Sequence, residues 1–493
     1  MGHRVSAVPS ASEESPSRLG QVGARRASAD IGLQLVGRVA NIALGIAVTV
    51  VLVRALGDTR FGQWSTLFAV AQIAGYIGDL GLGQIAVRKA AEEPHRERVW
   101  IGGLLSLRLL LSGPAVALTV GVSLVLSTDA EMRVSAVVLA TTIVASAITA
   151  LSAVFQLRIR NSLTAAFELA NGLLWGAAVF VLAALDAGIV AFAVAFAAVA
   201  AIVAALQAAF AAREVPLVLR GTRAQWPELI RVGLPVAISG LLILSYGRID
   251  QVLVFELDGE RGAGLYGAAY RVIDRAQMLP ATIMATLFPL IAAAHPADPL
   301  RVRQLVQVSL DLLIGVALPV FAFTAAASGP LVLLLFGEEF REVDTALVVL
   351  TGGYILTAVG FLCGFVIIVL SLQRRFLRYA AIGLVMNVAL NLLLIPRYGY
   401  IAAAWVIGAT QVVVIGLSLR LIFSELHQRL RVGRLARIAV AAAAMGALVV
   451  VGDGAGLPIG VLMLVAVASY AVLLLLLRAV TAAEVRLLAR RGG

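Results

Sequence analysis

The chain has 493 residues, of which 61% are hydrophobic and only 14% are charged, and its mean hydropathy is +0.98. Soluble chains are about 45–50% apolar and about 25% charged, so this composition excludes a soluble multidomain protein. About 14 spans of ~20 residues would use ~280 residues, which matches the apolar fraction. The formal net charge of +11 comes from arginine, which indicates basic cytoplasmic loops rather than a nucleic-acid partner.

Residues 1–32 are rich in Ser, Ala and Arg without apolar periodicity, which predicts a disordered cytoplasmic tail. Apolar spans then follow at 33–53, 61–83, 100–127, 134–157, 165–184, 187–211, 228–256, 264–293, 305–327, 343–371, 376–396, 400–424, 436–452 and 457–479. We therefore predict an all-α polytopic membrane protein with about 14 transmembrane helices. An N-terminal six-helix bundle would cover 33–212, a C-terminal six-helix bundle 213–425, and a C-terminal helix pair with a cytoplasmic tail 426–493.

The distribution of basic residues predicts the orientation of these spans. If the N-terminus is cytoplasmic, 28 of the 39 Lys and Arg residues fall in cytoplasmic segments when the adjoining ends of the spans are counted with them, 6 fall in outer loops and 5 fall deeper inside spans. The outer loops carry acidic residues instead, among them Glu256, Asp258, Glu260, Glu338, Glu339, Glu342 and Asp344. Both termini are therefore predicted to be cytoplasmic.

The residues that catalysis and cofactor binding usually need are scarce. Lys89, the one lysine, lies in Val-Arg-Lys-Ala, so no Gly-Lys-Ser/Thr phosphate loop exists for ATP. Four scattered histidines and one cysteine, Cys363, give no metal-binding spacing and no internal disulfide. All loops are short, so no external domain is predicted to hold a glycosyltransferase site. We expect a protein that is not an enzyme and holds no metal or cofactor.

A short motif recurs after the first, seventh and eleventh spans. Leu56–Trp64 reads Leu-Gly-Asp-Thr-Arg-Phe-Gly-Gln-Trp, and Asp258–Arg261 with Leu265–Tyr270 follow about 205 residues later. Residues 396–401 give a third version, Pro-Arg-Tyr-Gly-Tyr-Ile. Glycine and aromatic residues favour interfacial turns in any membrane protein. Recurrence in two six-helix blocks instead favours duplication, and in duplicated transporters the substrate site lies between the repeats.

Five ionisable residues lie inside the seventh and eighth spans: Arg248, Asp250, Arg271, Asp274 and Arg275. Each would cost about 2.5–3.5 kcal/mol facing lipid, so we expect them to face a wet or protein-lined interior. Arg271 and Arg275 are four residues apart and share one helical face. Three arginines against two aspartates leave one positive charge, which favours binding of an anion such as phosphate. The alternative is mutual neutralisation that serves packing alone.

In the first half, Arg38, Asp79, Arg108 and Glu168 are the main charged residues inside spans. Arg38 and Arg108 lie within about two turns of the cytoplasmic face and could extend to the interface. Asp79 lies in Gly-Asp-Leu-Gly-Leu-Gly, where a helix break is allowed. Candidates for coupling transport to H⁺ or Na⁺ are the carboxylates Asp79, Glu168, Asp250 and Asp274. The membrane potential acting directly on a charged substrate is the alternative.

Three segments form a recognisable set: Asp79-Leu80-Gly81-Leu82-Gly83-Gln84 followed by Arg88, the stretch Leu333–Phe340, and Asn387-x-x-x-Asn391 followed by Pro396–Gly399. In this order they resemble the polysaccharide-exporter branch of the multidrug/oligosaccharidyl-lipid/polysaccharide flippase superfamily. The resemblance implies two helical bundles in a V around a central cavity and transport by alternating access. The substrate implied is an undecaprenyl-pyrophosphate-linked oligosaccharide that crosses the bacterial plasma membrane. The resemblance also implies that cavity arginines hold the pyrophosphate, and the matching candidates are Arg38, Arg248, Arg271 and Arg275.

The expected partners are the lipid-linked glycan, membrane lipid, and glycan polymerases or glycosyltransferases, with no nucleic acid. A lipid II flippase of cell-wall synthesis shares the predicted architecture and is one alternative. A cation-coupled multidrug exporter is another, but its cationic substrates need a cavity led by carboxylates, and the excess of arginine argues against it. A membrane glycosyltransferase or a helical scaffold that transports nothing would be a protein of another class.

Overall fold

The computed structural model describes residues 17–79, 81–158, 161–216, 218, 221–428 and 430–479, with side chains from Leu44 onwards except at 161, 235, 236 and 239. Its regular elements are all helical, which confirms the predicted fold class. In chain order they are α1 Ser17–Asp79, α2 Leu82–Glu92, η1 Pro94–Arg96, α3 Glu97–Leu126, α4 Ala130–Thr149, α5 Ser152–Leu157, α6 Asn161–Ala184, α7 Ile189–Glu214, η2 Thr222–Gln225, α8 Trp226–Tyr246, α9 Ile249–Ala276, α10 Met278–Ala294, α11 Pro299–Leu335, η3 Glu338–Phe340, α12 Val343–Val369, α13 Gln373–Tyr398, α14 Tyr400–Glu425, α15 Val432–Gly454 and α16 Ile459–Leu476.

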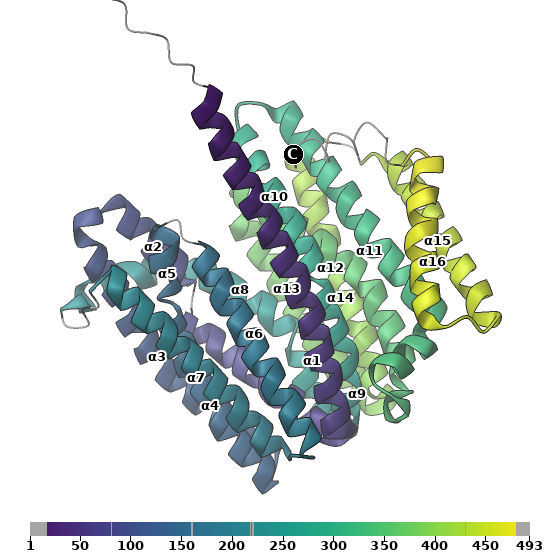
Figure 1. Cartoon of the computed structure of the whole chain (residues 1–493), viewed down its shortest axis with the longest axis horizontal. Coiled ribbons are helices and arrows are strands. Elements are labelled where there is room, and N and C mark those ends of the chain that lie inside the picture. Colours follow the sequence, from purple (N-terminus) through teal and green to yellow (C-terminus); the bar gives the residue numbers. More distant parts are fainter. Residues whose placement is uncertain are drawn as a thin grey trace, which may run out of the picture.

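The helices form two groups that lie close together at one end and lean apart at the other (Figure 1). Helices α3, α4, α6 and α7 form the first group, and α9 to α14 form the second, with α1 running between them. Helix α15 packs on α11, and α16 packs on α15 at the side of the second group. This arrangement is the V that the resemblance implies. The division at 33–212, 213–425 and 426–493 stays a prediction.

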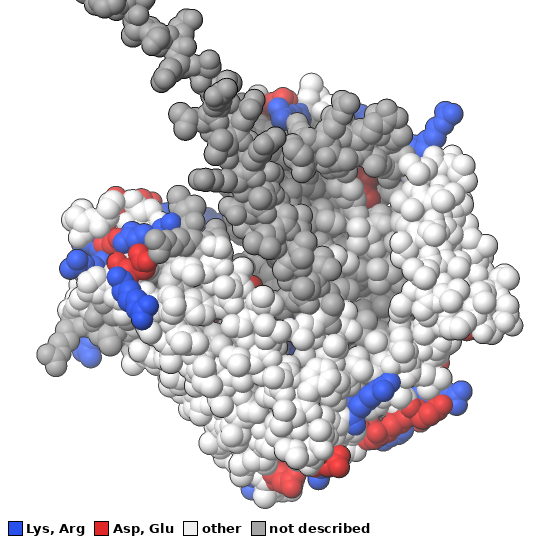
Figure 2. Space-filling view, viewed as in Figure 1, with Lys and Arg blue, Asp and Glu red and all other residues white. Residues whose placement is uncertain are grey.

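Length and hydropathy identify the chain as a multi-pass membrane protein. Eleven helical segments in the described ranges are long and apolar enough to cross a bilayer. One of them covers 55 residues, Gly240–Ala294, which as helix would measure ~80 Å against a hydrocarbon core of ~30 Å. It therefore holds more than one crossing, and the count of 14 stays a prediction. Figure 2 shows charged side chains gathered at the two ends, with an almost uncharged band between them.

The recurring sequence motif forms the same sharp turn each time. Helices α1 and α9 each change direction at a glycine, Gly57 with φ 68° and ψ 177°, and Gly259 with φ 84° and ψ −178°. Gly399 of the third motif has φ 63° and ψ −157°. A positive φ with ψ near 180° is essentially restricted to glycine, which explains why the motif contains it. The two turns lie 202 positions apart, close to the spacing of about 205 predicted from sequence.

The two repeats cross next to these turns, where their backbones touch. A Cβ atom added to Gly62 would lie 1.9 Å from the carbonyl oxygen of Glu260. One added to Gly264 would lie 1.8 Å from the carbonyl oxygen of Asp58. Gly62 and Gly264 are again 202 positions apart, so the crossing is symmetric. Because only hydrogen fits at both positions, the α1–α9 contact, the most extensive between two helices here, requires both glycines.

Side chains tie together the end of the molecule that carries these turns, which we call the outer end after its predicted orientation. Arg261 donates to Asp58 at 2.8 Å and to both carboxylate oxygens of Glu342 at 3.2 Å. The backbone N–H of Tyr400 donates to Asp258 at 2.8 Å, and its hydroxyl donates to the carbonyl of Glu342 at 2.8 Å. This outer network joins the first, seventh, ninth and eleventh predicted connections.

Two predicted spans, 228–256 and 264–293, are interrupted in the structure. Helix α8 ends at Tyr246 and α9 begins at Ile249, while α9 ends at Ala276 and α10 begins at Met278. A helix break inside a membrane leaves backbone carbonyls that need donors. The Tyr270 hydroxyl donates to the Gly247 carbonyl at 2.8 Å, and the Tyr354 hydroxyl donates to the Ala276 carbonyl at 2.9 Å. Tyr270, from the second half of α9, and Tyr354, from α12, therefore stabilise the two breaks.

The N-terminal region also differs from its prediction. Helix α1 begins at Ser17, so residues 17–32 are helical, whereas the composition predicts a disordered tail up to residue 32. These residues precede the first apolar span without a proline after position 16, and a helix that has formed extends at little cost through such a segment. Residues 1–16 lie outside the described residues.

Candidate functional site

A cavity lies along α1 on the side of the first group of helices, and Arg271 and Arg275 of α9 line it from the second group. One part, the arginine chamber, has a volume of about 310 Å³ and is lined by α1, α6 and α9 side chains that include Arg271 and Arg275. A larger part of about 650 Å³, the hydroxyl chamber, is lined by Thr142, Ser146, Thr149, Ser152 and Thr164 among others. The two chambers share the lining residues Phe68, Glu168, Asn171 and Phe196, so they adjoin.

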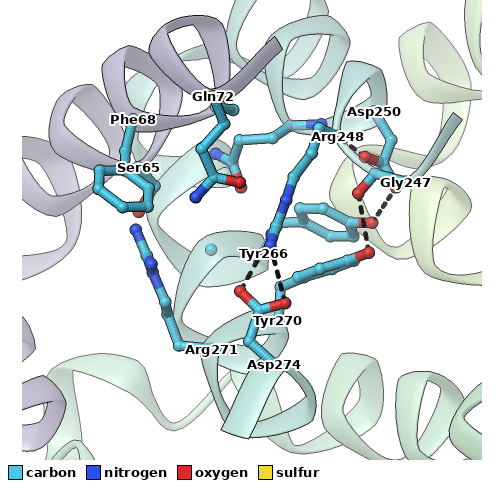
Figure 3. Close-up of a pocket in the computed structure, with 13 residues that line it drawn as sticks. Ser65, Phe68, Gln72, Gly247, Arg248, Asp250, Tyr266, Tyr270, Arg271 and Asp274 are labelled. Carbon is cyan, nitrogen blue, oxygen red and sulfur yellow. Dashed lines mark hydrogen bonds and ion pairs between the residues drawn. The ribbon is translucent and has the colours of Figure 1, made fainter. Parts of the chain in front are cut away.

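Arg248 and Asp274 form a bidentate ion pair at the α8–α9 break (Figure 3). Nη1 of Arg248 lies 3.0 Å from Oδ2 of Asp274, and Nη2 lies 3.0 Å from Oδ1. The guanidinium also stacks 5.1 Å from the centre of the Tyr270 ring. The structure thus neutralises Arg248 within the protein, as the packing alternative requires for this residue. Asp274 is held in the same pair.

Asp250 is completely buried beside this pair, and its partners are neutral groups. It accepts hydrogen bonds from the Tyr266 hydroxyl and, at 3.0 Å, from the Gln251 backbone N–H. Gln251 in turn donates to the Ala263 carbonyl at 2.9 Å. The carboxyl group therefore connects the two halves of α9 across the turn at Gly259.

Arg271 and Arg275 form no ion pair with any described residue. Arg271 points away from Asp274 and lies over the Phe68 ring, 4.4 Å from its centre (Figure 3). The Arg275 guanidinium carbon lies 2.8 Å from where a Cβ of Gly45 would be, so it rests against the backbone of α1. Both line the arginine chamber, as their shared helical face predicts. The structure leaves two guanidinium charges facing the cavity, one more than the sequence count indicates.

In the first half of the chain, Arg108 pairs with Asp79 at 2.9 Å and donates to Ser146 at 3.4 Å. Both charged residues line the hydroxyl chamber, so Arg108 is bound to a cavity partner and does not extend to the interface. Asp79 ends α1 at a helix break, and the following Gly81 has φ 63°. The side chain of Arg38 lies outside the described residues.

Glu168 of α6 lines both chambers, with Asn171 almost one turn further along the helix. No ion pair or hydrogen bond joins the Glu168 carboxylate to any described residue. Opposite charges therefore line the arginine chamber, with two guanidinium groups on α9 and one carboxylate on α6. The described residues include no group of three or more His, Cys, Asp or Glu that could hold a metal ion.

Sequence reasoning missed the aromatic and hydroxyl lining of the cavity. The Trp64 and Trp175 rings stack with centres 5.9 Å apart and an interplanar angle of 7°, and Phe196 meets Trp175 edge-on at 5.0 Å. A signal for the hydroxyl chamber did exist, because Thr142, Ser146 and Thr149 are spaced by four and three residues on one face of the fourth span. Thr and Ser also pack between membrane helices, so this spacing alone predicts no site.

The chain is thus a polytopic helical membrane protein with a charged internal cavity. Residues 28–295 match the family model described as polysaccharide biosynthesis protein. This match takes in more than half of the chain, and the protein therefore belongs to the polysaccharide biosynthesis protein family. The family resemblance predicted from sequence is confirmed.

Two curated relatives come from Haloferax volcanii. The probable flippase AglR is 27% identical over 173 residues, 34% of this chain and 36% of that protein. The probable low-salt glycan biosynthesis flippase Agl15 is 23% identical over 160 residues, 32% of this chain and 34% of that protein. The chain thus spans about a third of the length of the curated relatives that it matches.

Solved structures share the fold at low sequence identity. The lipid II flippase MurJ in an inward closed conformation aligns with a TM-score of 0.72 and 11% identity, over 90% of this chain and 97% of that one. An inward-facing multidrug resistance MATE transporter of the MOP superfamily aligns with a TM-score of 0.61 and 15% identity, over 80% and 98%. The likeness shows that the chain shares its fold with these solved membrane transporters.

Proposed function

We propose that the protein is a flippase that moves a polyprenyl-pyrophosphate-linked oligosaccharide across the plasma membrane for surface polysaccharide synthesis. The observation that carries this proposal is the pair of guanidinium groups, Arg271 and Arg275, which face the arginine chamber without a carboxylate partner among the described residues. Each charge inside a bilayer costs about 2.5–3.5 kcal/mol, and an anionic ligand offsets that cost. Guanidinium binds phosphate oxygens bidentately, so two of them suit a pyrophosphate.

The shape of the molecule supports alternating access. The helical groups meet at the predicted outer end and lean apart towards the predicted cytoplasmic end (Figure 1). The polar head would enter from the cytoplasm, and the prenyl chain would stay in lipid. Both termini are cytoplasmic in this proposal, and glycan polymerases or glycosyltransferases act before or after the protein. Asp79, Glu168, Asp250 and Asp274 are the carboxylates that could couple transport to H⁺ or Na⁺.

The test is flipping of a fluorescent polyprenyl-pyrophosphate oligosaccharide in proteoliposomes, with wild type beside Arg271→Ala/Arg275→Ala. Each hydrogen bond to a charged group contributes about 1.5–3 kcal/mol, so losing two should slow flipping by at least ~100-fold. The matched control, Arg341→Ala/Arg397→Ala, removes two positive charges at the outer end and should flip like wild type. Full flipping by the cavity variant would contradict the anion site. Absence of flipping by folded wild type would contradict the function.

The same anion site would also hold the pyrophosphate of lipid II. Depletion in the native host separates the two substrates, because loss of a surface glycan with normal peptidoglycan is expected here, whereas a lipid II flippase would stop peptidoglycan synthesis. A drug exporter for cations is disfavoured, because Arg271 and Arg275 would repel its substrates.

A further inference from the structure

We propose that the cavity contains a glycan subsite in which Glu168 selects an uncharged sugar directly next to the pyrophosphate. This inference rests on the proposed function and specifies the substrate class. The sugar would carry free hydroxyl or N-acetyl groups and no carboxylate, and the remaining glycan would occupy the hydroxyl chamber.

The first observation that supports this subsite is the position of Glu168. Glu168 and Asn171 line both chambers from the same face of α6. The remaining residues common to both chambers are Phe68 and Phe196, which are aromatic. A head group with its phosphates on Arg271 and its glycan in the hydroxyl chamber must therefore pass Glu168 with the sugar that follows the phosphate.

The chemistry of the Glu168 carboxylate favours a neutral sugar over a uronic acid. An ionised carboxylate accepts hydrogen bonds and donates none, so it suits sugar hydroxyl or amide N–H groups. Among the described residues no ion pair or hydrogen bond engages the Glu168 carboxylate, so a uronic acid at this position would place two carboxylates side by side in the cavity. Asn171, which both donates and accepts, complements the exocyclic groups of a neutral sugar.

The aromatic wall next to Glu168 fits the apolar faces of a sugar ring. Trp175 lines the arginine chamber, and its ring is held between Trp64, at 5.9 Å, and Phe196, at 5.0 Å. A pocket that combines apolar walls with a few fixed polar groups binds ligands in one orientation. The wall and Glu168 therefore constrain the same sugar from two sides.

Apart from Glu168, the charged side chains that line the hydroxyl chamber are Asp79 and Arg108. Its ion pair, Asp79 with Arg108, is internally neutral. The Thr142 hydroxyl donates to the Leu139 carbonyl at 2.6 Å, and the Thr149 hydroxyl donates to the Ser146 carbonyl at 2.9 Å. Because their hydrogens are already engaged, these oxygens remain as acceptors for sugar hydroxyls. The chamber of about 650 Å³ lies within the ~300–1,000 Å³ range of small-molecule sites.

The experiment uses two fluorescent polyprenyl-pyrophosphate disaccharides that differ only at the first sugar, a neutral hexose in one and the corresponding hexuronic acid in the other. We expect wild type in proteoliposomes to flip the neutral lipid about 10-fold faster or more. Glu168→Gln should bring the ratio of the two rates below about three, and this ratio is the readout because Glu168 itself lines the cavity. Glu168→Asp keeps the charge and should keep the discrimination. Glu131→Gln, which removes a carboxylate at the outer end of α4, is the control and should leave the ratio unchanged.

Each of the other outcomes contradicts one part of the proposal. If wild type flips both lipids equally, the sugar selection is wrong and the flippase function stands. If folded wild type flips neither lipid, the proposed function itself is wrong. If Glu168→Gln stops both lipids equally and removes the dependence of flipping on a pH gradient, Glu168 is a coupling carboxylate and the subsite assignment is overturned.

Discussion

Charged side chains form ion pairs at the outer end, whereas several in the central cavity form none with any described residue. At the outer end, Arg261 lies between Asp58 and Glu342, each within 3.2 Å. In the cavity, Arg271, Arg275 and Glu168 have no ion-pair partner among the described residues. Water solvates the charges at the outer end, so their pairs contribute little energy and mainly fix geometry. Unpaired charges inside a membrane are costly, and a protein keeps them for a ligand.

The internal repeat sharpens this comparison. Turns and crossing glycines at the outer end recur with a spacing of 202 residues, so both copies contribute equally there. The cavity-facing charges do not recur, because the positions in α1 that correspond to Arg271, Asp274 and Arg275 of α9 are Ala69, Gln72 and Ile73. Duplication therefore explains the scaffold, whereas Arg271 and Arg275, the described arginines of the proposed anion site, lie in the second copy.

The largest effect is expected from breaking the symmetric crossing. Gly264→Ala places a Cβ 1.8 Å from the Asp58 carbonyl oxygen, far below the 3.0 Å that real Cβ atoms respect, so α1 and α9 must separate. We expect loss of folded protein, or an outer end that no longer closes, measured by yield and by thermal unfolding in detergent. Gly364→Ala is the control, because nothing lies within 4 Å of its Cβ position. Equal stability of both variants would exclude a close backbone crossing.

The second-largest effect is expected from breaking the ion pair between Arg248 and Asp274. Arg248→Ala leaves Asp274 unpaired in a buried site, and breaking such a pair costs about 3–5 kcal/mol. We expect a large drop in thermal stability that the double variant Arg248→Met/Asp274→Met largely restores. If the double variant is as unstable as the single one, packing of the side chains rather than charge pairing accounts for the loss.

A smaller effect is expected at the outer network. Arg261→Gln removes the charge shared by Asp58 and Glu342, and such an exposed pair contributes at most about 1 kcal/mol. The outer end should open more often, which raises the labelling rate of a Thr59→Cys reporter by up to about fivefold. Cys363 is buried and should not react. Unchanged labelling would show that the network does not control closure.

The smallest effect is expected at the end of the molecule predicted to be cytoplasmic, where Lys89 contacts Glu228 at 2.7 Å. This hydrogen bond raises the pKa of Lys89 above its ordinary value of 10.5. Because the folded protein holds this proton more tightly, the contribution to stability is complete below pH 10.5 and is lost as the pH rises through the folded pKa. Between pH 8 and pH 11, the unfolding temperature of Lys89→Met should fall slightly less than that of wild type. An identical pH dependence would contradict the contact.

The breaks between α8 and α9 and between α9 and α10 could not be predicted from the sequence. Gly247 and Gln277 both lie inside predicted spans, 228–256 and 264–293, and a hydropathy window averages over a single broken turn. Whether the freed carbonyls are tolerable depends on donors such as Tyr270 and Tyr354. The tyrosine that reaches each break is fixed by helix packing, which leaves no local pattern in the sequence.

The sequence by itself determined that the chain is embedded in a membrane, its class of fold, its family and the cluster of charges in the seventh and eighth spans. These follow from composition, from residues a few positions apart, or from motif order. Only the tertiary structure decided that Arg248 pairs with Asp274 and that Arg271 and Arg275 face the cavity. It alone places Glu168 between the two chambers. The physical reason is that pairing depends on which helices lie side by side and on side-chain direction, and charges more than 25 residues apart carry no local signal of either.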